Sequence, residues 1–142
     1  MRVKTTRELE RELSGTASLE RYLNRNNVSI LTEQPLMEEL NRIMREKDLH
    51  RTDIIAKSSL NDIYVHQIMS GKRHPSREKL LCLFFGMELD AETAQRVLKS
   101  CGYPPLYARK RRDAAVLYAM GKGMTLLQCN EALVGIGEEP LG

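Results

Sequence analysis

The stretch LHRTDIIAKSSLNDIYVHQIMSGKRHPS, residues 49–76, decides how this chain folds. Its apolar residues recur at helical spacing, so two short helices are predicted, one beginning near Arg51 and one with Asn61 as its N-cap. Only two or three residues join these helices, and so short a connection sets them at a steep angle. Gly71 suits the left-handed position that ends the second helix.

The apolar residues of this stretch also predict which side of each helix is buried. On the first helix the expected buried residues are Ile54, Ile55 and Ala56. On the second helix the expected inner face consists of Leu60, Tyr64, Val65 and Ile68.

The rest of the chain also has the pattern of short helices, and no run alternates apolar and polar residues for long enough to indicate a strand. We expect helices over residues 5–14, 18–27, 35–46, 76–85, 91–100, 108–120 and 125–135. The 18–27 helix has Leu19, Tyr22 and Leu23 on one side, the 35–46 helix has an apolar stripe, and the apolar run KLLCLFFGM at 79–87 predicts that the 76–85 helix is the central buried element. The stripe consists of Leu36, Met37, Leu40, Ile43 and Met44. The expected N-caps are Thr32, Ser76, Asp90 and Thr125. Pro35 is expected in the first turn after Thr32, and residues 103–107 are expected to form a linker.

Residues 49–76 resemble, without gaps, the core of the lambda repressor and Cro (XRE-type) family of helix-turn-helix domains. The likeness lies in the apolar positions, the short turn, the second helix and the closing Gly-basic-basic-x-Pro-Ser run. It implies a five-helix DNA-binding domain over residues 35–102, with a helical extension over 1–34 and a helical hairpin over 103–142. The expected fold class is therefore all-α.

Three positions depart from the pattern of that family. Ser59 stands where the turn usually has glycine, which strains the backbone if its φ angle is positive. Arg51 stands where glutamine is common, and an arginine there can still contact phosphate. The helix begins with Asn61 and Asp62, where the family usually has Ser-Arg or Gly-Gln.

In this family the outward face of the second helix enters the major groove of DNA. The resemblance therefore implies base contacts by Asn61, Asp62, Ile63, His66 and Gln67. Gln67 can bond bidentately to adenine, and His66 can donate to a guanine acceptor or to phosphate. Tyr64, between this face and the buried side, either packs against the first helix or contacts DNA. Asp62 has two interpretations, because its carboxylate either accepts from the N4 amine of cytosine or only stabilises the positive end of the helix dipole.

The resemblance also implies contacts to the DNA backbone. The residues concerned are Arg51, Thr52, Lys72, Arg73, His74, Ser76 and Arg77. The first backbone amides after Ser76 can hold a phosphate as an anion at a helix N-terminus. A basic loop that is only solvated remains the alternative, and the run ARKRRD at 108–113 is likewise interpreted as a solvated first helical turn or as a contact to DNA or a protein.

The charge is unevenly distributed along the chain. Residues 1–50 carry 9 basic and 9 acidic side chains, residues 51–112 carry 12 and 6, and residues 113–142 carry 1 and 4. The excess of 12 − 6 = +6 in the middle indicates an anionic partner such as nucleic acid.

Several classes of protein are not expected. No apolar run approaches the roughly 18 residues of a membrane helix, and no apolar stretch follows the charged start, so a cytoplasmic protein is expected. The three cysteines form no CxxC pair, which predicts reduced, buried thiols and no metal site. No nucleophile motif, P-loop or HExxH occurs, so we expect neither an enzyme nor a bound cofactor.

The leading interpretation is therefore a sequence-specific transcriptional regulator that binds double-stranded DNA as a homodimer. The dimer surface is expected in residues 103–142, in the first thirty residues, or in both. The tail at 138–142 is expected to fray. The alternative from another class is a protein interaction module, such as an adaptor or antitoxin, that keeps the helix-turn-helix fold without binding DNA and uses residues 103–142 or another surface.

Overall fold

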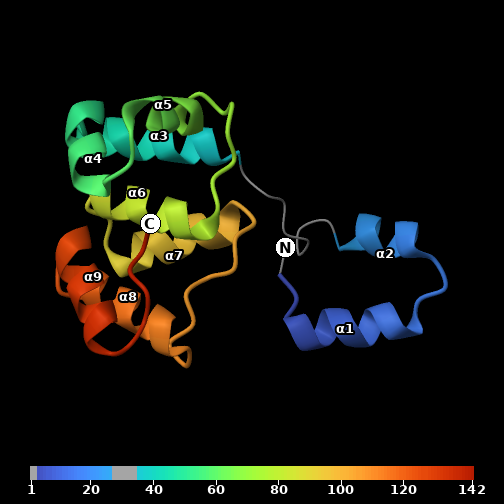
Figure 1. Ribbon diagram of the computed structural model, residues 1–142. Coiled ribbons are helices and arrows are strands. Elements are labelled where there is room, and N and C mark those ends of the chain that lie inside the picture. The colour runs from blue at the N-terminus through green and yellow to red at the C-terminus, as the bar shows by residue number, and fades with distance from the viewer. Residues whose placement is uncertain (1–2, 27–34) are drawn as a thin grey trace. The chain divides into compact units, whose positions relative to one another are not determined.

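The structure is a computed structural model that describes residues 3–26 and 35–142. Within these ranges the secondary structure consists of helices without strands, which confirms the all-α class (Figure 1). The bounds are α1 Thr6–Gly15, α2 Leu19–Arg25, α3 Leu36–Lys47, α4 Arg51–Ser58, α5 Asp62–Met69, α6 Arg77–Gly86, α7 Ala91–Ser100, α8 Arg111–Gly121 and α9 Leu126–Gly135. The chain divides into two compact units, with the boundary between residues 33 and 34.

The unit of α1 and α2 is small and weakly packed. Thr5 and Ser18 cap the two helices through their side-chain oxygens. Tyr22 is its buried apolar residue among those described, whereas Leu19 and Leu23 are exposed, so the apolar side expected for α2 is buried only at Tyr22. The predicted cap Thr32 lies outside the described residues.

Polar contacts hold this first unit together instead of a core. Glu12 accepts hydrogen bonds from Lys4 at 3.1 Å and Asn26 at 2.7 Å, and pairs with Arg25 at 2.9 Å. The hydrogen bond from Lys4, followed by that from Asn26, lowers the pKa of the Glu12 carboxyl. A unit with so little buried apolar surface gains little stability by itself.

The larger unit is built around α6, as its apolar sequence predicts. Every residue from Leu80 to Gly86 is buried, and α6 and α7 lie between the α3–α5 group and the α8–α9 pair (Figure 1). Gly86 lets α4 approach α6 closely, since a Cβ there would lie 2.6 Å from the carbonyl oxygen of Ile54 and 2.8 Å from the Cβ of Ser58. Side chains of α3 to α9 form one continuous core.

The connection between α4 and α5 is as short as predicted. Ser59 has φ 60° and ψ 17°, the left-handed conformation anticipated for this position, and the hydroxyl of Ser58 accepts from the amide of Leu60 at 3.3 Å. Ile54 is buried and Ile55 half-buried, but Ala56 is exposed, contrary to expectation. The helix meets the core through Ile54 and Ser58, four residues apart, which turns Ala56 outward.

The start of α3 also differs from the prediction. Pro35 is its N-cap residue and not part of its first turn, and no side chain caps the helix there. The predicted apolar stripe of this helix is largely confirmed by the buried Leu36, Leu40 and Ile43. Met37 lies at the rim, where its sulfur comes within 2.3 Å of the position of a Cβ on Gly71.

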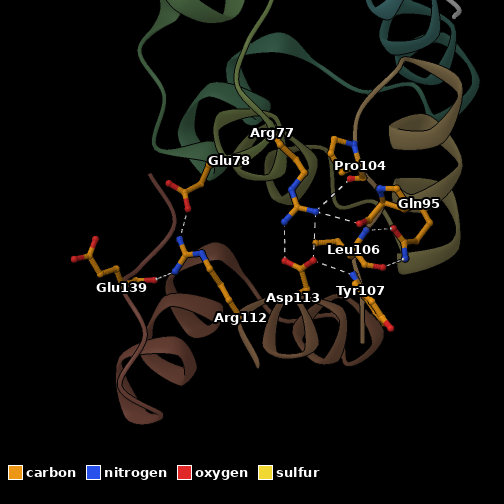
Figure 2. A network of polar contacts seen from close by, with 10 residues as sticks. Arg77, Glu78, Gln95, Pro104, Leu106, Tyr107, Arg112, Asp113 and Glu139 are labelled. Carbon is orange, nitrogen blue, oxygen red and sulfur yellow. Dashed lines mark hydrogen bonds and ion pairs between the residues drawn. The ribbon is translucent and has the colours of Figure 1, made fainter. Parts of the chain in front are cut away.

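The segment 103–107 is not helical, as expected, yet it is fastened to the domain (Figure 2). The side chain of Gln95 bonds both the amide and the carbonyl of Leu106, at 2.7 and 2.8 Å. The carboxylate of Asp113 accepts from the amide of Tyr107 at 2.9 Å and pairs with Arg77 at 2.7 Å. These contacts hold residues 107–110 in a turn, so α8 begins at Arg111 and not near 108.

The C-terminal tail does not fray. Leu141 is buried, and the side-chain amide of Asn130 bonds both its backbone amide and its carbonyl. Arg112 donates to the carbonyl of Glu139 and pairs with Glu78 of α6 (Figure 2). The expectation of a frayed tail is therefore wrong. Of the cations at 108–113, Arg111 and Arg112 have oxygen partners in and near the tail, whereas Arg109 and Lys110 are exposed, so the solvated interpretation holds only for the latter two.

Candidate nucleic-acid interface

Helix α5 is fixed so that one face is buried and the other is open. The side chain of Asn61 caps it, accepting from the amide of Tyr64 at 2.7 Å, while Val65, Ile68 and Met69 are buried. The amide of Asn41 on α3 donates to the carbonyl of Met69 at 2.9 Å and so holds the end of α5.

The outward face of α5 carries most of the residues predicted to contact bases. Asn61, Asp62, Ile63 and His66 are exposed and Gln67 is half-buried. Ile63 is 67% exposed, which gives this polar face one apolar position. The carboxylate of Asp62 accepts from the amide of Ile63 at 2.8 Å, so one of its oxygens meets the helix terminus and the other has no partner among the described contacts.

Arg51, the first residue of α4, lies against His66. Its guanidinium nitrogen Nη1 is 2.6 Å from Nδ1 of the imidazole, although the two residues are fifteen positions apart. The Nε of the same guanidinium is buried and has no hydrogen-bond partner among the described residues. Arg51 is thus directed along α5 and not simply into solvent.

Arg73, beyond the end of α5, makes a similar contact with Gln67. Its Nε donates to Oε1 of Gln67 at 2.8 Å, and its guanidinium carbon lies 5.2 Å from the centre of the Tyr64 ring. The backbone amides of Lys72 and Arg73 both donate to the carbonyl of Gln67. Tyr64 is half-buried, so its ring supports this arginine.

The other residues predicted to contact phosphate divide into two groups. Thr52, Lys72 and His74 are exposed, and the ring of His74 stacks on Tyr103 with centroids 5.0 Å apart. Burial raises the pKa of the Tyr103 phenol to about 12, and its hydroxyl donates to the carbonyl of Pro75 at 2.6 Å. The loop after α5 is therefore attached to the 103–107 segment.

Two predicted phosphate contacts already have internal partners. Ser76 caps α6 by accepting from the amide of Lys79 at 3.2 Å. Arg77 donates to the carboxylate of Asp113 and to the carbonyl oxygens of Pro104 and Pro105 (Figure 2). This arrangement makes Arg77 a link between α6 and α8.

A shallow hollow of about 370 Å³ follows the outer side of α5. Its lining consists of Arg51, Ile63, His66, Gln67, Met69, Ser70 and Lys72. Two predicted phosphate contacts and three predicted base contacts are therefore brought together, while Asp62, His74 and Arg77 lie outside this lining. Its lining combines two basic side chains with the hydrogen-bonding side chains of His66, Gln67 and Ser70, so the hollow suits an anionic, hydrogen-bonding partner.

The contacts that sequence reasoning missed are those of Arg51 with His66 and of Arg73 with Gln67. Both arginines were predicted as backbone contacts, and nothing in the spacing pairs them with neighbours on α5. The basic character of the segment was the only signal that pointed to them.

Three further features of the described residues concern the cysteines, metal-binding clusters and membrane-spanning helices. Cys82, Cys101 and Cys129 are buried and form no disulfide, as predicted, and burial raises the pKa of the Cys129 thiol to about 11. In residues 3–26 and 35–142 no three His, Cys, Asp or Glu side chains are placed to hold a metal ion. Within those same ranges no helix has the length and apolarity to cross a membrane.

Comparison with known proteins does not assign this chain to a family. No family model matches the chain, and neither a curated protein nor a solved structure shows significant similarity to it.

Proposed function

We propose that this chain is a sequence-specific DNA-binding regulator of the lambda repressor and Cro type, with α5 as the recognition helix in the major groove. The observation that carries this proposal is the outward face of α5. It is exposed, mostly polar and bordered by Arg51 and Lys72, and the left-handed Ser59 sets α5 off α4 by a short turn.

The geometry of α5 supports major-groove binding for a physical reason. The major groove of B-DNA admits a helix, and base edges there present donors and acceptors that polar side chains can pair with. Asn61, Asp62, His66 and Gln67 supply such groups, and Ile63 supplies an apolar contact for a thymine methyl. Phosphate contacts by Thr52, Lys72 and His74 would position the helix without specifying sequence.

Arg77 and Ser76 carry less weight in this proposal. The guanidinium of Arg77 is engaged with Asp113, and the hydroxyl of Ser76 caps α6, so a phosphate would compete with these contacts. The free backbone amides at the start of α6 remain suited to an anion.

A homodimer is part of the proposal, because one domain of this size buries too little surface for tight and selective DNA binding. Its surface is proposed in the α8–α9 pair, where several large apolar side chains are exposed. These are Tyr118 on α8, Leu127 and Val134 on α9, and Ile136 just after it.

Salt dependence of duplex binding tests the proposal. We expect the affinity for a random-sequence duplex pool to fall by orders of magnitude between about 50 and 200 mM salt, if six or more phosphates are contacted. Selection and sequencing from the same pool would then give the operator. If the chain shows no salt-sensitive binding to the duplex pool, the proposal that it is a DNA-binding regulator is wrong.

A protein interaction module is the second candidate, favoured by two observations. The carboxylate of Asp62 stands at the very start of α5, where it would repel phosphates, and α8 and α9 expose the apolar side chains named above. This candidate predicts no salt-sensitive binding to duplex DNA. An adaptor or antitoxin of this kind would bind its partner through α5, α8 or α9.

A further inference from the structure

We propose that two arginines beside the recognition face determine which bases it reads. Arg51 and Arg73 each contact one residue predicted to touch bases, and each occupies an acceptor atom of that residue. The two recognition residues are left as hydrogen-bond donors, which selects guanine. This inference rests on the proposed DNA binding and deepens it to a base preference.

The contact between Arg51 and His66 fixes the tautomer of the imidazole. A guanidinium has only donors and stays protonated, so the ring nitrogen 2.6 Å from its Nη1 has to accept. In the neutral imidazole the proton then resides on Nε2. Because His66 is exposed, this Nε2–H is the group available to a base.

The contact between Arg73 and Gln67 fixes the orientation of the amide in the same way. Arg73 donates from Nε to Oε1 of Gln67 at 2.8 Å, and Tyr64 supports its guanidinium. A bidentate contact to adenine needs this Oε1 to accept from the N6 amine of the base. The bond from Arg73 takes one of the two lone pairs of Oε1 and turns this oxygen toward the arginine, so the NH₂ group is the part of the amide that is free to face a base. The adenine contact predicted from sequence is therefore disfavoured.

Two donors on the recognition face favour one base in particular. Guanine presents two acceptors, N7 and O6, and no donor in the major groove, whereas adenine presents one acceptor beside its N6 amine and thymine one acceptor beside its methyl group. Asp62 lies four residues before His66, on the same face of α5, and its second oxygen can accept from cytosine N4. An acceptor beside two donors matches the edge of G·C pairs, so the operator should have G·C pairs under α5.

The tautomer can be measured in the free protein. Two-bond ¹⁵N–¹H correlation spectra of the full chain should show His66 protonated on Nε2, and Arg51→Met should remove this fixed state. Arg51→Lys, which keeps a donor, should retain it. Protonation on Nδ1 in the unmodified chain, or the same spectrum in Arg51→Met, would overturn the Arg51 half of the inference without any DNA.

The base preference is measured by selecting from a random duplex pool with the full chain and with variants. The consensus of the unmodified chain should contain guanines, and Arg73→Met should move one position toward adenine, changing the guanine-to-adenine ratio by about tenfold. Lys72→Met is the matched control, since it removes the same charge one residue away. It should weaken binding to all sequences alike and leave the consensus unchanged.

The outcomes separate the two levels of the proposal. If the chain selects no duplex, both the proposed DNA binding and the base preference are wrong. The tautomer of His66 is tested separately, because its spectrum is recorded without DNA. If the chain selects a consensus without guanine, the inferred base preference is wrong, whereas the proposed function as a DNA-binding regulator is not contradicted. The same holds if Arg73→Met and Lys72→Met give the same consensus as the unmodified chain. The Arg73 result does not depend on whether Arg51→Met folds.

Discussion

Two groups of arginines in the larger unit have opposite kinds of partner. Beside α5, Arg51 and Arg73 contact the neutral side chains of His66 and Gln67. At the starts of α6 and α8, Arg77 and Arg112 pair with Asp113 and Glu78. All four arginines belong to the same basic stretch of sequence.

The difference indicates what each group can do. An arginine paired with a carboxylate is already neutralised, so binding a phosphate would cost it that pair. An arginine beside a neutral acceptor keeps its charge available, and a nearby phosphate adds to its contacts. We infer that the first group serves recognition and the second group serves the fold, and the following changes test this division.

Asp113→Ala should have the largest effect on stability. The Asp113 side chain is 5% exposed, and its loss leaves Arg77 unpaired and the amide of Tyr107 without its acceptor. We expect the free energy of unfolding to fall by about 2–3 kcal/mol, somewhat below the range for a fully buried pair because Arg77 is partly solvated. Urea unfolding measures this, and a change below about 0.5 kcal/mol, the usual range for surface substitutions, would show that the pair is not structural.

Gly86→Ala should lower the stability of the chain by disturbing the packing of α4 against α6. The added Cβ would meet the backbone carbonyl of Ile54, which cannot move without shifting α4. We expect a loss of about 1–3 kcal/mol in unfolding free energy and a weakened contact between Arg51 and His66. Thermal unfolding and the His66 ¹⁵N spectrum together check this. The control is Gly121→Ala, because Gly121 has nothing within 4 Å of an added Cβ.

Ser59→Gly should stabilise the chain. Ser59 has φ 60°, where an L-residue is strained and glycine is not, so we expect a gain of roughly 1 kcal/mol. The midpoint of urea unfolding should rise, and the operator preference should stay unchanged because Ser59 is not in the hollow along α5. A lower midpoint would mean that the serine side chain contributes more than the strain costs.

Lys72→Ala should have the smallest effect on stability and a clear effect on binding. The side chain is exposed, so the unfolding free energy should stay within about 0.5 kcal/mol. The slope of log affinity against log salt should become shallower by about one, as for the loss of one phosphate contact. Arg112→Ala is the comparison, because it removes the same charge from the other group and should leave that slope unchanged.

Local sequence signals predicted much of the fold. The side chains of Asn61, Ser76, Asp90 and Thr125 cap their helices as expected, because capping depends on residues three positions apart. The start of α8 was misplaced for the converse reason. It depends on Asp113 holding the amide of Tyr107, and on Arg77, which pairs with Asp113 from 36 residues earlier in the chain.

The candidate site was predicted only in part. Its position on α5 follows from the resemblance and from the exposed polar face, but the orientation of its side chains does not. His66 and Gln67 are placed by arginines fifteen residues before and six residues after them. No spacing rule within one helix links such positions.

The sequence by itself determined that the chain is helical, the short turn at Ser59, the burial of α6 and four helix caps, which are Asn61, Ser76, Asp90 and Thr125. Each of these follows from periodicity and from contacts between near neighbours. Only the tertiary structure decided which cations have acidic partners and which remain at the surface. It also decided that the tail is held by Asn130 and Arg112. The reason is physical: the partner of a long charged side chain is set by the packing of separate elements, and its own sequence neighbourhood carries no record of it.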